Sequence, residues 1–236
     1  MYRFYRNNMK SEQLISYNLK IEETDLYISS DIYLYDQSHA CISYLRNQIQ
    51  DYIKKNFEFK TSLSPIILSD DVPEIISRMS RASKLTNVGP MASVAGAISQ
   101  MLCEQVATQC DNFIVENGGD IYLKTNQDRI ISIYAGENNL KDKLKILIKK
   151  ELSPISICSS SSNFGHSLSF GKADCVTILS KDAFLCDSCA TAICNMVRSP
   201  EDIPVALEHA MSIDGILGAI VIISGKIGII GDIELA

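Results

Sequence analysis

Four residues near the middle of the chain, Asn117-Gly118-Gly119-Asp120, constrain its fold more than any other segment. Apolar residues lie on both sides of them within residues 112–124. A two-residue turn between paired strands requires positive φ angles, which glycine adopts without steric cost. The segment therefore predicts a β-hairpin closed by a tight turn.

Strand-like and helical segments alternate along the rest of the chain. Alternating apolar residues predict a hairpin within residues 24–35, with a break at Ser29-Ser30. Helices are predicted over residues 38–53, 73–84 and 91–110, the last rich in small residues that allow close approach of another backbone. Further strands are predicted over residues 129–134, 155–158 and 172–180, whereas residues 140–150 fit either helix or strand.

A helix capped by Ser180, a helix over residues 201–211 and two strands around Ser224-Gly225-Lys226 complete the prediction. This order is typical of an α+β (mixed α/β) fold. No internal repeat or linker divides the chain, so we expect one domain over residues 1–236, with two related lobes as the alternative.

Composition narrows the class of protein. Apolar residues make up 46% and charged residues 21%, which is typical of a globular chain. The 22 Lys and Arg against 28 Asp and Glu, without a basic run, argue against nucleic-acid binding. The charged N-terminus is followed by no apolar segment, and the apolar run over residues 216–223 is far shorter than the roughly 20 residues of a membrane span. We expect a cytoplasmic protein without membrane contact.

The Asn117–Asp120 turn also has chemical potential. Its glycines would expose backbone N–H groups beside a carboxylate, which suits a phosphate or nucleotide ligand. An ordinary hairpin turn of the same sequence needs no ligand, because Asn-Gly is the usual hairpin dipeptide. Both interpretations are compatible with these four residues.

A polar segment over residues 159–169 predicts a loop. Ser159, Ser160, Ser161 and His166 supply hydroxyl groups and an imidazole suited to a ribose, a diphosphate or an acyl oxyanion. A solvent-exposed loop would have the same composition, so the segment alone leaves both interpretations open.

Asp187 and Thr191 stand four residues apart in a predicted helix. On one helix face they could offer a carboxylate and a hydroxyl oxygen to Mg²⁺, which often takes its other ligands from water or substrate phosphates. The alternative is a solvated Asp beside a Thr whose hydroxyl bonds to its own helix.

Eight cysteines include a Cys-x-x-C motif at Cys186 and Cys189. Free thiols are expected in a reducing compartment, and apolar neighbours favour buried, inert side chains. A lowered pKa near a helix start would instead make these thiols redox-active or sulfur-carrying.

Taken in order, residues 87–96, Asn117–Asp120, residues 157–174 and residues 187–192 resemble the ApbE superfamily, over roughly residues 24–235. The strings Val-Gly-Pro-Met-Ala and Phe-Gly-His-Ser-Leu-Ser-Phe-Gly-Lys-Ala-Asp are typical of its cytoplasmic branch in methanogens and other anaerobes. The resemblance implies an ApbE-like fold with a mixed, largely antiparallel sheet packed against helices.

ApbE proteins are flavin transferases that bind FAD and, with Mg²⁺, move FMN onto a threonine of a target protein. By resemblance, Asn117, Gly118, Gly119 and Asp120 would line the flavin site, with Ser159, Ser160 and Ser161 nearby. Asp187 and Thr191 would hold the metal, and His166 would be catalytic. Unlike the transferase pattern, His166 is followed by no Asp-Pro.

The same branch is associated with sulfide incorporation into homocysteine. This implies a second hypothesis, a thiol protein that works with a sulfur-transfer partner and uses Cys158 as its sulfur-bearing residue. A third is a non-catalytic binding protein. The apolar C-terminal hairpin, residues 216–230, could bury an edge in a homodimer.

Overall fold

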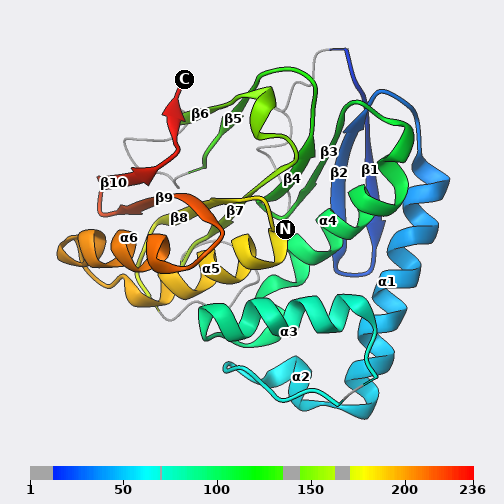
Figure 1. Ribbon diagram of the computed structural model, residues 1–236, viewed down its shortest axis with the longest axis horizontal. Coiled ribbons are helices and arrows are strands. Elements are labelled where there is room, and N and C mark those ends of the chain that lie inside the picture. Colours follow the sequence, from blue (N-terminus) through cyan, green and yellow to red (C-terminus); the bar gives the residue numbers. More distant parts are fainter. Residues whose placement is uncertain (1–12, 70, 135–143, 163–170) are drawn as a thin grey trace.

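The computed structural model describes residues 13–69, 71–134, 144–162 and 171–236. Its centre is an eight-stranded sheet of order β1-β2-β3-β4-β7-β8-β9-β10, in which every neighbouring pair is antiparallel. Helices cover one face of this sheet, and a three-stranded sheet of order β11-β6-β5 covers the other (Figure 1). The α+β fold expected from the sequence is confirmed.

The strands are β1 (Ile15–Ile21), β2 (Thr24–Ser30), β3 (Phe113–Asn117), β4 (Asp120–Lys124), β5 (Arg129–Ser132), β6 (Lys145–Ile148), β7 (Ile155–Ser160), β8 (Cys175–Ser180), β9 (Ile216–Ile223), β10 (Lys226–Gly231) and β11 (Glu234–Leu235). The α-helices are α1 (Tyr35–Lys55), α2 (Glu58–Thr61), α3 (Glu74–Thr86), α4 (Val94–Val106), α5 (Ala183–Met196) and α6 (Ile203–Ser212). A 3₁₀ turn, η2 (Pro90–Ser93), leads into α4.

The order of these elements gives the chain two halves with a common plan. In the first half, the helices α1 to α4 lie between the hairpins β1–β2 and β3–β4. In the second, α5 and α6 lie between β7–β8 and β9–β10. The halves meet where β4 pairs with β7, so they share one continuous sheet. The single domain over residues 1–236 stays a prediction.

Alternation along the strands divides the core between the two faces of the sheet. On β4, Tyr122 packs with the core beneath α1, α3 and α4, whereas Ile121 and Leu123 pack with the small sheet. A strand directs successive side chains to opposite faces, which explains this division. Asp120 precedes Tyr122 by two residues and so belongs to the helix-covered face.

The predicted turn between β3 and β4 is confirmed. Gly118 and Gly119 have φ angles of 73° and 109°, and Asn117 pairs with Asp120 across the hairpin. The Gly119 N–H donates to Glu116 Oε1 over 2.9 Å. Positive φ at both central residues is what a type I′ turn needs.

The predicted hairpin within residues 24–35 is wrong in its pairing. β2 pairs instead with β1, which lies before it in the chain. The exposed fractions of Ile32 and Tyr33 are 42% and 58%, so these apolar residues do not belong to a buried strand.

The cap of α5 and the length of β7 also differ from the prediction. Asp182, not Ser180, accepts hydrogen bonds from the N–H groups of Phe184 and Leu185. The Ser180 hydroxyl donates to the carbonyl of Gly215 instead. Strand β7 continues to Ser160, and the undecided segment 140–150 contains β6.

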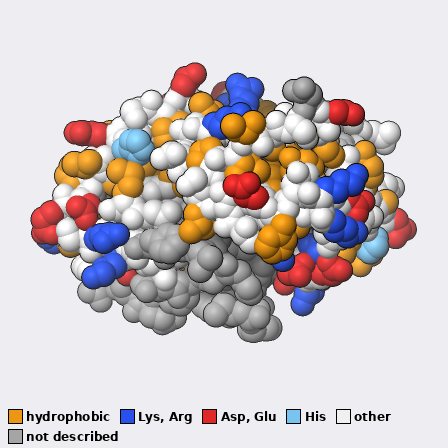
Figure 2. All heavy atoms as spheres, turned by 90° about the horizontal axis from the view of Figure 1, so that it is seen from below, with side chains coloured by type: hydrophobic (Ala, Val, Ile, Leu, Met, Phe, Trp, Pro, Cys, Tyr) orange, Lys and Arg blue, Asp and Glu red, His pale blue; other side chains and the backbone are white. Residues whose placement is uncertain are grey.

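The outer face of the helical layer is seen in Figure 2. On its visible part, Lys and Arg side chains are interspersed with acidic and apolar ones and form no continuous basic stripe. Within the described residues, no helix is both long and apolar enough to span a membrane.

Candidate functional site

The junction of the two halves brings together residues that the sequence singled out separately. Asn117 and Asp120, at the ends of β3 and β4, lie on the helix-covered face beside the N-terminus of α4. The Asn117 Nδ2 group donates to the carbonyl of Ala95 over 3.2 Å. From the second half, α5 packs on β7 and contributes Asp187. The candidate site therefore lies between β4, β7, α4 and α5.

Asp187 is held against the first turn of α4. Its Oδ2 accepts the Gly96 N–H over 2.9 Å, and the Ala95 N–H also lies close enough to stabilise its charge. The first N–H groups of a helix have no partner within it, and its positive dipole end favours a carboxylate. Asp187 therefore acts as a cap for a helix far away in sequence.

Close packing makes this contact possible. A Cβ on Gly96 would lie 2.2 Å from the carbonyl oxygen of Ala183 and 3.0 Å from the Cβ of Asp187. The small residues of the 91–110 segment thus allow α5 to approach, as their composition predicts.

Burial dominates the electrostatics of the two carboxyl groups. It raises the pKa of Asp187 from 3.8 to about 7, against the opposing effect of the Gly96 and Ala95 N–H groups. Burial, followed by the charge of Asp187, raises the pKa of Asp120 well above its usual range. The Ser159 N–H, 3.2 Å from Asp120 Oδ1, and the Cys158 thiol partly offset this.

No basic side chain balances this pair in the described part of the chain, where neither carboxylate takes part in an ion pair. Both residues are nevertheless more than nine-tenths buried, with exposed fractions of 7% and 9%. Ionising both would leave two buried negative charges close together, which is costly without a cation.

The elements that carry this pair supply further oxygen atoms, on α5 and on the neighbouring strand β7. Thr191, also buried, lies one helical turn beyond Asp187 on the same face of α5. On β7, the Ser160 Oγ is buried and has no hydrogen-bond partner among the described residues. Carboxylate and hydroxyl oxygens fit Mg²⁺, which needs few protein ligands. Groups of three or more His, Cys, Asp or Glu arranged for a metal are absent from the described residues.

The remaining predicted ligand residues lie around this centre in different ways. Gly119 borders open space, since nothing lies within 4 Å of a Cβ placed on it. Ser159 contributes its backbone N–H to Asp120, but its hydroxyl faces the other side of the sheet and bonds to Thr177 over 2.8 Å. Ser161 is half-buried just after β7. His166 lies outside the described residues.

Cys158 lies at the centre of the junction but is fully buried. Its pKa is raised, first by desolvation and then by contact with Cys186. The Cys186 thiol donates to the carbonyl of Ile178 over 3.0 Å, and burial also raises the pKa of Cys189. The raised pKa values of Cys158 and Cys189 and the burial of all three thiols favour their interpretation as core residues.

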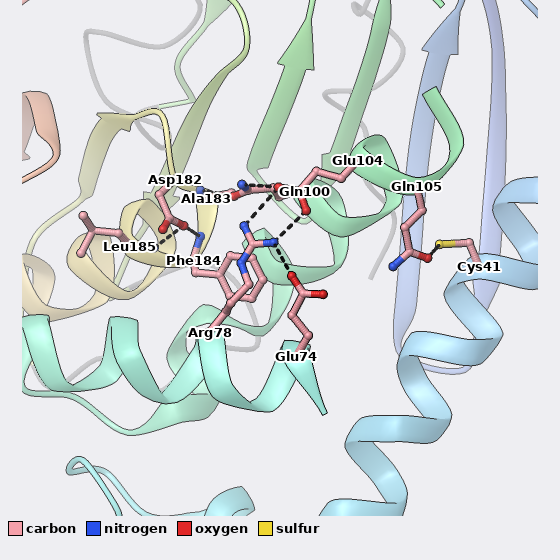
Figure 3. A network of polar contacts seen from close by, with 10 residues as sticks. All are labelled: Cys41, Glu74, Arg78, Gln100, Glu104, Gln105, Asp182, Ala183, Phe184 and Leu185. Carbon is pink, nitrogen blue, oxygen red and sulfur yellow. Dashed lines mark hydrogen bonds and ion pairs between the residues drawn. The ribbon is translucent and has the colours of Figure 1, made fainter. Parts of the chain in front are cut away.

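Sequence reasoning missed the contacts that hold α4 and α5 together. The Ala183 N–H donates to Gln100 Oε1, and Gln100 is bonded in turn to Glu104 (Figure 3). Neither residue belongs to a motif, so no signal in one sequence identifies them. The small residues around Gly96 are the only local sign that this helix is closely approached.

The arrangement of sheet and helices is that of an ApbE-like fold. ApbE flavin transferase of Vibrio cholerae, in its H257G mutant, has the same fold with a TM-score of 0.58 and 14% identity, covering 92% of this chain and 97% of that one. The ApbE protein of Thermotoga maritima matches with a TM-score of 0.57 and 12% identity, covering 95% and 97%. At such identities the likeness concerns the fold alone.

The chain belongs to the family whose model is described as AbpE bacteria, which matches residues 6–228. A UPF0280 protein of Methanocaldococcus jannaschii is 41% identical over 219 residues, covering 90% of this chain and 89% of its own length. A UPF0280 protein of Methanothermobacter thermautotrophicus is 40% identical over 195 residues, covering 80% and 75%. The resemblance to ApbE proteins and to a branch in methanogens is confirmed.

Proposed function

We propose that this protein binds a flavin or a similar nucleotide together with Mg²⁺ at the junction of its two halves, and transfers a group from that ligand. The observation that carries the proposal is the pair Asp120 and Asp187, two buried carboxyl groups without a basic partner among the described residues. The shared fold with ApbE flavin transferases supports flavin as the first ligand to test.

The pair implies a cation because of what its ionisation costs. Each carboxyl group has a raised pKa, so near neutral pH the empty site holds a proton more readily than two charges. A divalent cation replaces that proton and makes the ionised pair favourable. Binding of Mg²⁺ should accordingly release protons and strengthen with rising pH.

A phosphate-bearing ligand follows from the small number of protein ligands. Asp120, Asp187 and the hydroxyl groups of Thr191 and Ser160 would hold Mg²⁺ with few protein oxygens, and Mg²⁺ usually takes its remaining ligands from water or substrate phosphates. A diphosphate would supply such ligands. The Gly118-Gly119 turn, with open space beside Gly119, is the part of the site that a bulky nucleotide can approach.

The sulfur-carrying hypothesis is less well supported. Cys158 would have to act as a thiolate, yet its side chain is fully buried and its pKa is raised. We therefore prefer the nucleotide to the sulfur ligand. A persulfide on Cys158 after exposure to a polysulfide, whose sulfane sulfur a thiol can accept without another oxidant, would reverse this preference.

The test is a titration of the purified protein with FAD, with and without Mg²⁺, followed by flavin fluorescence and calorimetry. We expect tight binding only with Mg²⁺, and its loss in Asp187→Asn and Asp120→Asn. Asp51→Asn is the matched control, because Asp51 lies on α1 and pairs only with neighbouring Lys54 among the described residues.

Equal binding of FAD without Mg²⁺, or unchanged Mg²⁺-dependent binding in Asp187→Asn, would contradict the proposal. A protein that ignores FAD and nucleoside diphosphates but gains sulfur mass would support the thiol hypothesis instead.

A further inference from the structure

Two hydrogen bonds, one helical turn apart, join α4 to α5. The Gly96 N–H donates to Asp187 Oδ2 over 2.9 Å, and the Ala183 N–H donates to Gln100 Oε1 over 2.6 Å. Gly96 and Gln100 are four residues apart on α4, and Ala183 and Asp187 are four residues apart on α5. Each helix thus satisfies a first-turn N–H group of the other.

The orientation of the Gln100 amide is fixed from its other side. Its Nε2 donates to Glu104 Oε1 over 2.7 Å, which leaves the amide oxygen directed at Ala183 (Figure 3). A carboxylate at position 104 can only accept, so it selects the amide nitrogen.

Arg78 of α3 holds Glu104 in turn. Its guanidinium donates to both carboxylate oxygens, over 2.7 and 3.1 Å, and its Cζ lies 4.2 Å from the centre of the Phe184 ring. Bidentate contact and stacking restrict a guanidinium more than either contact alone. The chain of contacts therefore runs from α3 through α4 to the first turn of α5 (Figure 3).

We propose that Gln100 is a positioning residue for the cation site, an inference that rests on the proposed function. It touches neither the site's carboxylates nor a ligand. It fixes the first turn of α5, and so holds the Asp187 carboxylate against the N-terminus of α4 and beside Asp120. Glu104 and Arg78 act through Gln100.

The experiment uses Mn²⁺ as the probe and measures its affinity by electron paramagnetic resonance. Gln100→Leu keeps the side-chain volume but loses the acceptor, and we expect Mn²⁺ to bind roughly 10- to 100-fold more weakly. The double variant Gln100→Glu with Glu104→Gln restores an acceptor for Ala183 and a donor between the two positions, so it should recover the affinity. Gln105→Leu is the matched control, since Gln105 lies on the same helix and its side chain accepts only the Cys41 thiol among the described residues.

A second readout needs no cation. The Gly96 N–H donates to Asp187 and should therefore be protected from hydrogen exchange. Gln100→Leu should accelerate its exchange relative to the C-terminal amides of α4, whereas Gln105→Leu should not. If the wild-type protein binds no Mn²⁺, the proposed function fails, but the Gly96 exchange rate still tests the positioning role.

Unchanged Gly96 exchange in Gln100→Leu, or failure of the double variant to recover Gly96 protection, would overturn the inference. If Gln100→Leu does not fold, Gln100→Met replaces it, because it also removes the acceptor for the Ala183 N–H and has an unbranched side chain of similar size.

Discussion

Replacing Asp187 by Asn should change how the stability of the protein depends on pH. In the folded protein the pKa of Asp187 is about 7, against an ordinary value of 3.8. Between these values the folded state binds more protons than the unfolded state, so the free energy of unfolding falls as pH rises. Asn cannot ionise, yet its side-chain oxygen can still accept the Gly96 N–H.

The size of the effect follows from the two pKa values. The difference between 3.8 and about 7, at about 1.36 kcal/mol for each pKa unit, corresponds to roughly 4 kcal/mol. Protonated Asp187 raises the free energy of unfolding by this full amount below about pH 4, relative to its value at high pH. The excess falls between about pH 4 and pH 7 and is lost above that window. We therefore expect Asp187→Asn to gain roughly 4 kcal/mol relative to the wild type between pH 4 and pH 8.

Urea unfolding at a series of pH values, with EDTA present, measures this difference. Asp51→Asn, which removes an exposed carboxyl group on α1, should follow the wild-type profile. At pH 8, added Mg²⁺ should raise the free energy of unfolding of the wild type towards its low-pH value. It should leave the free energy of unfolding of Asp187→Asn unchanged. Parallel pH profiles for the wild type and Asp187→Asn would refute the reasoning, because they would mean that Asp187 has an ordinary pKa.

Three further predictions concern packing, capping and thiol reactivity. Gly96→Ala should destabilise the protein by at least about 1–3 kcal/mol in urea unfolding, because its Cβ would meet the Ala183 carbonyl; an unchanged midpoint would contradict the close approach. Asp182→Ala should cost about 1 kcal/mol in the same assay, since it removes the N-cap of α5. Asp214→Ala, at an exposed position just before β9, should cost little. Cys158 should react with a thiol reagent far more slowly in the native protein than in urea, as peptide mass mapping would detect; rapid native labelling would show an accessible thiol.

Local patterns predict the parts of this fold that local chemistry determines. The tight turn at Gly118-Gly119 follows from the need for positive φ, and α1 follows from the helical spacing of residues such as Ile42 and Leu45, which are fully buried. The partner of β2 could not be predicted this way. Alternation reports that a strand is half-buried but not which other strand pairs with it.

The candidate site likewise has parts that the sequence predicts and parts that it does not. Asp120 and Asp187 can be recognised as candidates by their motifs, but their proximity depends on how β4, β7 and α5 pack together. The sequence could not predict which side of the sheet Ser159 faces either. It predicts a loop from residue 159, whereas β7 continues to Ser160. Gln100 gave no signal, since its role depends on contacts with Ala183 and Glu104.

The junction of β4 with β7 has a mechanical consequence. Asp120 comes from the first half of the chain and Asp187 from the second, so neither half alone contains the proposed cation site. An ion bound by both would form a crosslink between two parts that otherwise share only the sheet and helix contacts at their boundary. Part of the binding free energy would then oppose separation of the two halves. Loss of the ion would weaken the protein at the boundary between β4 and β7.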